Sequence, residues 1–193
     1  MSGPKGLLLY HGAGGNKDQH TLVALEDQLQ LPVRRLNFPY RELSTGPRPP
    51  DRMPKLVAAI GEEAARAASD WGIEPSELLL GGRSMGGRAC SVAHAEGLVC
   101  AGLVLLSYPL HPPRQPKKLR TEHFGDISAP VLIVQGNKDP FGTPAKFRYH
   151  AKRIAGPVEL VWLRNANHEP AAHDDAIVAA VADWIERLRG PIC

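Results

Sequence analysis

Three residues of this 193-residue sequence have the types and the order needed for nucleophilic catalysis. Ser84 stands at the centre of a G-x-S-x-G motif, within the letters GGRSMGG of residues 81–87. A serine hydroxyl is a weak nucleophile until a base takes its proton, and that base needs an acid to orient it. Asp139 and His168 come later in the chain, each just after an apolar run. We therefore predict Ser84 as the nucleophile, His168 as its base and Asp139 as the orienting acid.

The glycines around Ser84 are what a sharp turn between a strand and a helix requires. A serine exposed at such a turn has a strained backbone, and glycine on either side lets the strand and the helix approach without a Cβ clash. The motif follows the apolar run Leu78–Gly81 and opens a helix-like stretch near 84–96. The amino end of a helix directs N–H groups at a developing oxyanion, so the Met85 N–H is one predicted donor. The alternative is a plain glycine-rich turn.

A second glycine-rich run, HGAGG at residues 11–15, ends the first apolar segment. We expect it to supply the other oxyanion donor, the N–H of Ala13, with Gly14 as the alternative. The competing interpretation is a phosphate-binding loop. Residues 16–18 lack the Lys-Ser/Thr pair of a Walker-type loop, and the run does not match G-x-G-x-x-G, so a nucleotide site is not expected.

The two partners of the serine also have simpler explanations. Asp139 precedes Pro140 and could be a turn or capping residue, while His168 could be a solvent-facing loop histidine. The three positions nevertheless agree jointly in order and in placement after apolar runs, which favours a catalytic function. His173 is a poorer base because it falls near the start of the last helical pattern.

Six short apolar runs alternate with segments of helical periodicity. The runs are rich in Leu and Val, as strands buried on both faces of a parallel sheet are, and they are Gly6–His11, Val33–Phe38, Leu78–Gly81, Ala101–Ser107, Val131–Gly136 and Val158–Leu163. Helical spacing is clearest over 53–71 and 177–188 and weaker near 18–30, 84–96 and 143–155. This alternation predicts one α/β domain over residues 1–193, with a mainly parallel sheet and right-handed crossovers.

Two stretches interrupt the alternation. Ser44–Pro54 contains four prolines and is expected to lead in extended form into the following helix. Tyr108–Ala129 is a 22-residue connection in which one short helix is expected, over 119–127. Connections of that length are uncommon inside a compact domain and are usually functional or mobile. The basic cluster Arg114–Arg120 could attract an acidic substrate; the alternative is a solvated run of charge.

Composition argues against several classes of protein. The 23 basic and 20 acidic residues give a net charge of +3, too small to argue for nucleic acid or a membrane surface as a partner. The three cysteines lack the paired spacing of metal sites and are expected to be reduced thiols. No metal and no organic cofactor is implied. The amino-terminal apolar run 7–10 is too short for a signal peptide or a membrane span, so we expect a soluble, cytoplasmic protein.

Together these motifs resemble those of the α/β-hydrolase superfamily over nearly the whole chain. Within it, the sequence is most similar to the small testis-expressed α/β-hydrolase-like family and its bacterial relatives, through GGRSMG at 81–86, SYPLHP at 107–112, KLR at 118–120 and ANH at 166–168. Dienelactone hydrolases resemble it more distantly, since their nucleophile is a cysteine where this chain has Ser84. The resemblance implies a three-layer α/β/α sandwich with strands in the spatial order 2-1-3-4-5-6.

The resemblance also places the Tyr108–Ala129 connection at the carboxyl end of the sheet, beside the nucleophile, where many members insert a lid. Its 22 residues are too few for a large helical cap. We therefore expect an α/β-hydrolase fold without a cap domain and with an open, shallow site. Tyr108, Leu110 and His111 are expected to border that site, with His11 as a further pocket candidate.

These expectations combine into a serine hydrolase that cleaves a small ester or thioester through an acyl-enzyme intermediate. Two alternatives use the same residues. A degenerate hydrolase fold could serve only as a binding or scaffold protein, with the proline-rich basic connection as its partner surface. An acyltransferase could pass the acyl group to an alcohol or a thiol instead of water. A dehalogenase is not expected, because its chemistry places an aspartate where Ser84 stands.

Overall fold

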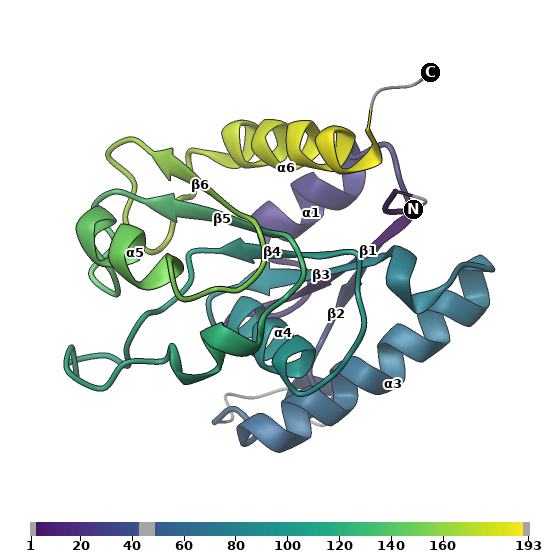
Figure 1. Ribbon diagram of the computed structural model, residues 1–193, viewed down its shortest axis with the longest axis horizontal. Helices are drawn as coiled ribbons and strands as arrows, with labels where there is room; N and C mark the ends of the chain where they lie inside the picture. The colour runs from purple at the N-terminus through teal and green to yellow at the C-terminus, as the bar shows by residue number, and fades with distance from the viewer. Residues whose placement is uncertain (1–2, 43–48, 191–193) are drawn as a thin grey trace.

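The computed structural model describes residues 3–42 and 49–190, and a parallel β-sheet runs through its centre. The strand order is β2-β1-β3-β4-β5-β6, which confirms the predicted order. Helices cover both faces, so the predicted three-layer α/β/α architecture is also confirmed (Figure 1). The strands are β1 (Gly6–Tyr10), β2 (Val33–Leu36), β3 (Leu78–Arg83), β4 (Gly102–Leu106), β5 (Val131–Gly136) and β6 (Val158–Leu163).

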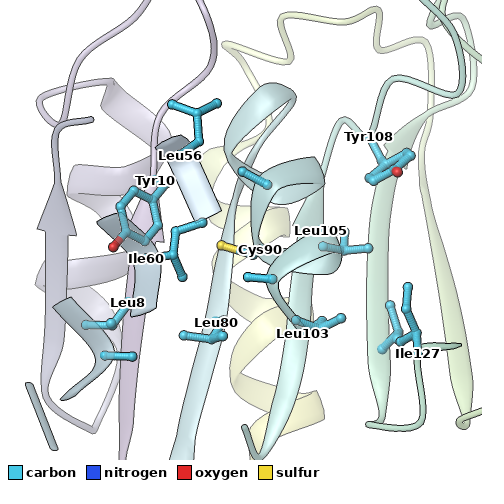
Figure 2. Packing of buried hydrophobic residues seen from close by; sticks show 14 of the residues in the cluster. Leu8, Tyr10, Leu56, Ile60, Leu80, Cys90, Leu103, Leu105, Tyr108 and Ile127 are labelled. Carbon is cyan, nitrogen blue, oxygen red and sulfur yellow. The ribbon is translucent and has the colours of Figure 1, made fainter. Parts of the chain in front are cut away.

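Two hydrophobic clusters hold the helical layers to the sheet, because successive strand residues point to opposite faces. Leu8 and Tyr10 of β1 pack in one cluster with the helices of the first layer (Figure 2), and Leu7 and Leu9 pack in the other. The first layer contains α3 (Met53–Trp71), α4 (Met85–Ala95) and α5 (Pro144–Ala151); the second contains α1 (His20–Gln28) and α6 (Asp174–Arg189). None of the helices within the described residues is long and apolar enough to cross a membrane.

The predicted elements differ from the structure mainly at their ends and at the sheet edges. The strand expected over Val33–Phe38 ends at Leu36, and a four-residue helix, α2 (Pro39–Glu42), follows it. Burial on both faces is wrong for β2 and most of β6, whose residues are only partly buried because each strand lies at an edge. Of the expected extended lead Ser44–Pro54, residues 44–48 lie outside the described chain, and α3 already begins at Met53.

The connection from Tyr108 to Ala129 packs onto the sheet layer and adds no helical cap within the described residues. The helix expected over 119–127 is a shorter 3₁₀ helix, η2 (Glu122–Asp126), which buries Phe124. A second 3₁₀ helix, η1 (Pro75–Glu77), leads into β3. Residues 110–120 of the connection form a closed loop, because the Arg120 N–H donates to the Leu110 carbonyl at 2.8 Å.

The turn from β3 into α4 packs directly against the end of β1. A Cβ atom added to Gly82 or to Gly86 would lie less than 3.0 Å from the carbonyl oxygen of Tyr10. At Gly86 it would also lie 2.7 Å from the carbonyl carbon of Tyr10 and 2.8 Å from the carbonyl oxygen of His11. These are main-chain atoms that cannot rotate away, so both positions require glycine for reasons of space.

Gly86→Ala is therefore expected to lower the free energy of unfolding by about 1–3 kcal/mol or more, because the backbone of β1 must move to admit the methyl group. Gly61→Ala is the matched control: Gly61 lies in α3 with no atom within 4 Å of the added Cβ. Alanine in that helix interior should stabilise by about 0.5–1 kcal/mol. Urea denaturation of both variants measures the difference, and a Gly86→Ala protein as stable as the parent would contradict the packing argument.

Candidate active site

Ser84 occupies the tight turn between β3 and α4 that its motif predicts. Its φ of 51° and ψ of −111° place a residue with a Cβ in a sparsely populated backbone region, which costs of order 1–3 kcal/mol. The Ser84 N–H donates to the Leu106 carbonyl at the end of β4, at 2.8 Å, and its carbonyl accepts from Arg88 at 3.0 Å. The turn is thus held from both sides, and the side chain lines a cavity at the carboxyl end of the sheet.

The structure brings His168 and Asp139 to this serine. The Ser84 Oγ lies 2.9 Å from His168 Nε2, and His168 Nδ1 lies 2.7 Å from Asp139 Oδ2. A carboxylate only accepts hydrogen bonds, so Nδ1 carries the proton and Nε2 is left to accept from the serine hydroxyl. Asp139 follows β5 and His168 follows β6, and the carboxyl ends of parallel neighbours meet at one edge of the sheet.

Asp139 is buried and its orientation is fixed by two further donors. The Gln135 side-chain amide donates to Oδ2 at 2.7 Å, and the Phe141 N–H donates to Oδ1 at 2.8 Å. The Phe141 ring also meets the His168 imidazole edge-on, with centroids 4.4 Å apart. Sequence reasoning missed Gln135 and Phe141. The signal for Gln135 was a polar residue at the end of an otherwise apolar buried strand, since a buried polar side chain needs a hydrogen-bond partner.

Arg83, directly before the serine, ties the His168 loop to the end of β3. Its guanidinium donates to the His168 carbonyl and pairs with the Glu169 carboxylate at 2.6 Å. Burial lowers the pKa of Arg83, and the carboxylates of Glu169 and Asp139 oppose that effect. Glu169 also accepts from the Gln19 side chain at 3.2 Å, which connects the loop to the segment before α1.

The two residues predicted to supply the oxyanion donors line the same cavity as Ser84. Met85 is the first residue of α4, and Ala13 lies in the glycine-rich loop after β1. Tyr40 and Arg41 hold that loop by donating to the carbonyls of Ala13 and Gly14, at 2.9 and 2.8 Å. Among the residues that the structure describes, neither the Met85 nor the Ala13 N–H has an acceptor, so both are available to a ligand.

The cavity has a volume of about 810 Å³, and its wall contains four arginines. Arg41, Arg83, Arg88 and Arg120 all line it, together with backbone of the glycine-rich loop and the start of α3. The Tyr108–Ala129 connection contributes Pro109, Pro113 and Arg120 to the wall. The wall therefore combines positively charged side chains with an apolar surface.

None of the four predicted pocket residues is among those that line this cavity. His11 is fully buried: its Nδ1 donates to the Gly12 carbonyl at 2.7 Å, its Nε2 accepts from the Phe38 N–H at 3.2 Å, and burial lowers its pKa. Tyr108 and Leu110 are core residues with no exposed surface. His111 is 6% exposed and its Nδ1 donates to the next carbonyl in the chain.

Removing the Arg83 guanidinium is expected to loosen the His168 loop. In Arg83→Met, amide hydrogen exchange over residues 164–170 should speed up by about 10-fold or more, because a buried charged hydrogen bond contributes about 1.5–3 kcal/mol. Glu169→Gln, which retains the donor to the His168 carbonyl, should show a smaller effect. Arg187→Met breaks an exposed ion pair with Glu159 and is the control. Unchanged exchange in Arg83→Met would contradict the proposed tie.

The comparisons with known proteins agree with this fold. Residues 4–181 match the family model described as an alpha/beta hydrolase domain. Among solved structures, Est1E from Butyrivibrio proteoclasticus is 15% identical, with a TM-score of 0.72 over 99% of this chain and 90% of that one. The Bacillus cereus carboxylesterase is 20% identical, with a TM-score of 0.69 over 97% and 92%. An alpha-beta serine hydrolase homologue from Coxiella burnetii is also 20% identical, with a TM-score of 0.70 over 97% and 86%. With a family match over most of its length and the fold of these structures, this chain belongs to the α/β-hydrolase family.

Proposed function

We propose that this protein is a serine hydrolase that cleaves a carboxylic ester or thioester through an acyl-enzyme intermediate. The observation that carries the proposal is the continuous row of hydrogen bonds from Ser84 Oγ through His168 to Asp139, at 2.9 and 2.7 Å, with the serine facing a cavity. A hydroxyl, an imidazole and a buried carboxylate in this geometry form the constellation that activates serine on several unrelated folds.

In the first half of the reaction, Ser84 Oγ attacks the acyl carbon while His168 Nε2 takes its proton. Asp139 keeps the imidazole in the tautomer that has a free Nε2 and stabilises the imidazolium that forms. The N–H groups of Met85 and Ala13 receive the oxyanion of the tetrahedral intermediate, and each such donor contributes a factor of about 10²–10³. The intermediate collapses when His168 returns the proton to the leaving alkoxide or thiolate.

In the second half, water replaces the leaving group and His168 acts again as the base. Hydroxide adds to the acyl carbon, the oxyanion forms in the same place, and Ser84 leaves with the proton from the imidazolium. Ser84 and His168 are both partly exposed to solvent. Water entry therefore needs no conformational opening, which favours hydrolysis over transfer of the acyl group to another acceptor.

Two cysteines are excluded as rival nucleophiles by their surroundings. Burial raises the pKa of Cys90, and burial raises that of Cys100 to about 12. The thiolate is the reactive form of cysteine, so neither is available at neutral pH. The named esterase and hydrolase structures support the proposal only through their shared fold.

A fluorophosphonate probe is expected to label the protein at Ser84, and Ser84→Ala should abolish both labelling and hydrolysis of short p-nitrophenyl esters. Ser69→Ala removes an exposed serine from α3 and should change neither. Asp139→Asn should retain the fold and lower kcat by about 10⁴-fold, since the amide favours the wrong imidazole tautomer.

The outcomes separate the alternatives. Labelling that survives Ser84→Ala sinks the assignment of the nucleophile. Absence of both labelling and ester hydrolysis in the parent protein indicates a fold used for binding alone. If labelling occurs and the acyl group appears mainly on an added alcohol or thiol, the protein is an acyltransferase that uses the same three residues.

A further inference from the structure

Four arginines line the cavity beside Ser84, and the guanidinium groups of two of them already bind other groups of the protein. Arg83 pairs with Glu169 at 2.6 Å, and Arg41 donates to two carbonyls of the glycine-rich loop, at 2.7 and 2.8 Å. Arg88 and Arg120 remain. Within the described chain neither has an ion pair or a side-chain hydrogen bond, and the Arg88 Nε is buried without a partner.

These two arginines are held at fixed places in the wall. Arg88 lies one helical turn after Ser84 in α4, and its N–H donates to the Ser84 carbonyl at 3.0 Å. Residues four apart share a helix face, so its side chain starts on the face of the nucleophile. Arg120 is anchored through its main chain, which donates to Leu110 and accepts from the Tyr108 hydroxyl, both at 2.8 Å.

The charges of Arg88 and Arg120 are not balanced by the acids of the cavity. Asp51 and Glu169 line it, but Asp51 pairs with Lys55 at 3.0 Å and Glu169 with Arg83. Burial lowers the pKa of Arg120, and the charge of Arg88 lowers it further. The exposed carboxylate of Glu122 opposes these effects on the pKa of Arg120, but it forms no ion pair with either arginine in the described chain. Two partly buried like charges without an ion-pair partner are costly, and an anionic ligand offsets that cost.

The neighbouring His123 adds no third positive charge to the pair. Burial and the charge of Arg88 lower the pKa of His123 to about 4, so it is neutral at pH 7 and its Nε2 is engaged with the Ser91 hydroxyl at 2.8 Å. The basic cluster predicted over Arg114–Arg120 contributes only Arg120 to the cavity. Lys117 and Lys118 are exposed and do not line it.

We infer that Arg88 and Arg120 form a subsite for a negatively charged group of the substrate, a carboxylate or a phosphate attached several bonds from the scissile carbonyl. This inference rests on the proposed hydrolase function and names its substrate class. Guanidinium forks match such oxyanions bidentately, which gives both affinity and orientation. In a half-ester of a dicarboxylic acid, the anion that binds the two arginines belongs to the acyl group. In an ester of a carboxylated or phosphorylated alcohol, it belongs to the leaving group.

The kinetic test compares charged esters with neutral ones of equal length. For a charge on the acyl side, the mono-p-nitrophenyl esters of succinate, glutarate and adipate are compared with the p-nitrophenyl esters of butyrate, pentanoate and hexanoate. For a charge on the alcohol side, carboxymethyl and phosphoethyl pentanoate are compared with propyl and butyl pentanoate. The best charged ester should exceed its neutral partner by about 10-fold or more in kcat/KM. Arg88→Gln and Arg120→Gln should each remove about 10-fold from the charged ester and less than about 3-fold from the neutral one.

Two controls separate a subsite from general attraction. Lys118→Gln removes one exposed charge from the same connection and should leave the preference for charged esters unchanged. If that preference came from electrostatic steering alone, Lys118→Gln would weaken it about as much as Arg88→Gln or Arg120→Gln does. Arg88→Lys should restore part of the preference, because it returns the charge without the fork. Thermal unfolding of every variant by circular dichroism shows whether it is folded before its kinetics are compared.

Binding measured without turnover keeps this inference separate from the proposed function. Calorimetry on Ser84→Ala should detect glutarate or inorganic phosphate, with the signal lost when Arg88→Gln or Arg120→Gln is added. If Ser84 is labelled and hydrolyses esters but shows neither a charged-ester preference nor this binding, the subsite is overturned and the hydrolase stands. If binding depends on both arginines while labelling and hydrolysis are absent, the subsite stands and the hydrolase is overturned.

Discussion

The main chain at the end of β1 lies so close to the turn between β3 and α4 that no side chain fits between them. Gly82 and Gly86 provide that space, and Ser84 between them adopts a backbone conformation that the contact imposes. The glycine-rich loop follows directly from the same end of β1, so one contact sets the positions of both Ser84, the proposed nucleophile, and this loop. The geometry of the site therefore depends on a main-chain packing constraint before it depends on any side chain of the proposed triad.

The remaining parts of the site reach the serine because all six strands are parallel. Their carboxyl ends share one edge, where the loops after β5 and β6 place Asp139 and His168 side by side. Hydrogen bonds then fix these residues in place. Gln135 donates to the Asp139 carboxylate, and Arg83 donates to the main-chain carbonyl of His168. Such supporting contacts reduce the reorganisation that a reaction would otherwise require.

Much of this could be predicted from the sequence, because alternating apolar and amphipathic segments have few solutions other than a parallel sheet with helices on both faces. The G-x-S-x-G turn, and the positions of Asp139 and His168 just after apolar runs, can also be read directly from the sequence. The pocket wall was not predictable in the same way. A residue's position near a strand end does not determine whether its side chain points into the pocket or into the core. Tyr108 and Leu110 lie in the core, because burying their apolar surface there is more favourable than exposing it in the cavity wall. Arg88 was missed, although its four-residue spacing from Ser84 places both on one helix face.

In the connection that follows β4, the Arg120 N–H donates to the Leu110 carbonyl and the Tyr108 hydroxyl donates to the Arg120 carbonyl. These hydrogen bonds close the base of a loop whose exposed tip, residues 114–118, does not line the cavity. Segments outside such a closure tolerate added sequence well, because longer loops cost only a slowly growing entropy and no buried contact is lost. This tip is therefore an insertion point at which a lid or a binding module can be added, by evolution or by engineering, without disturbing the sheet.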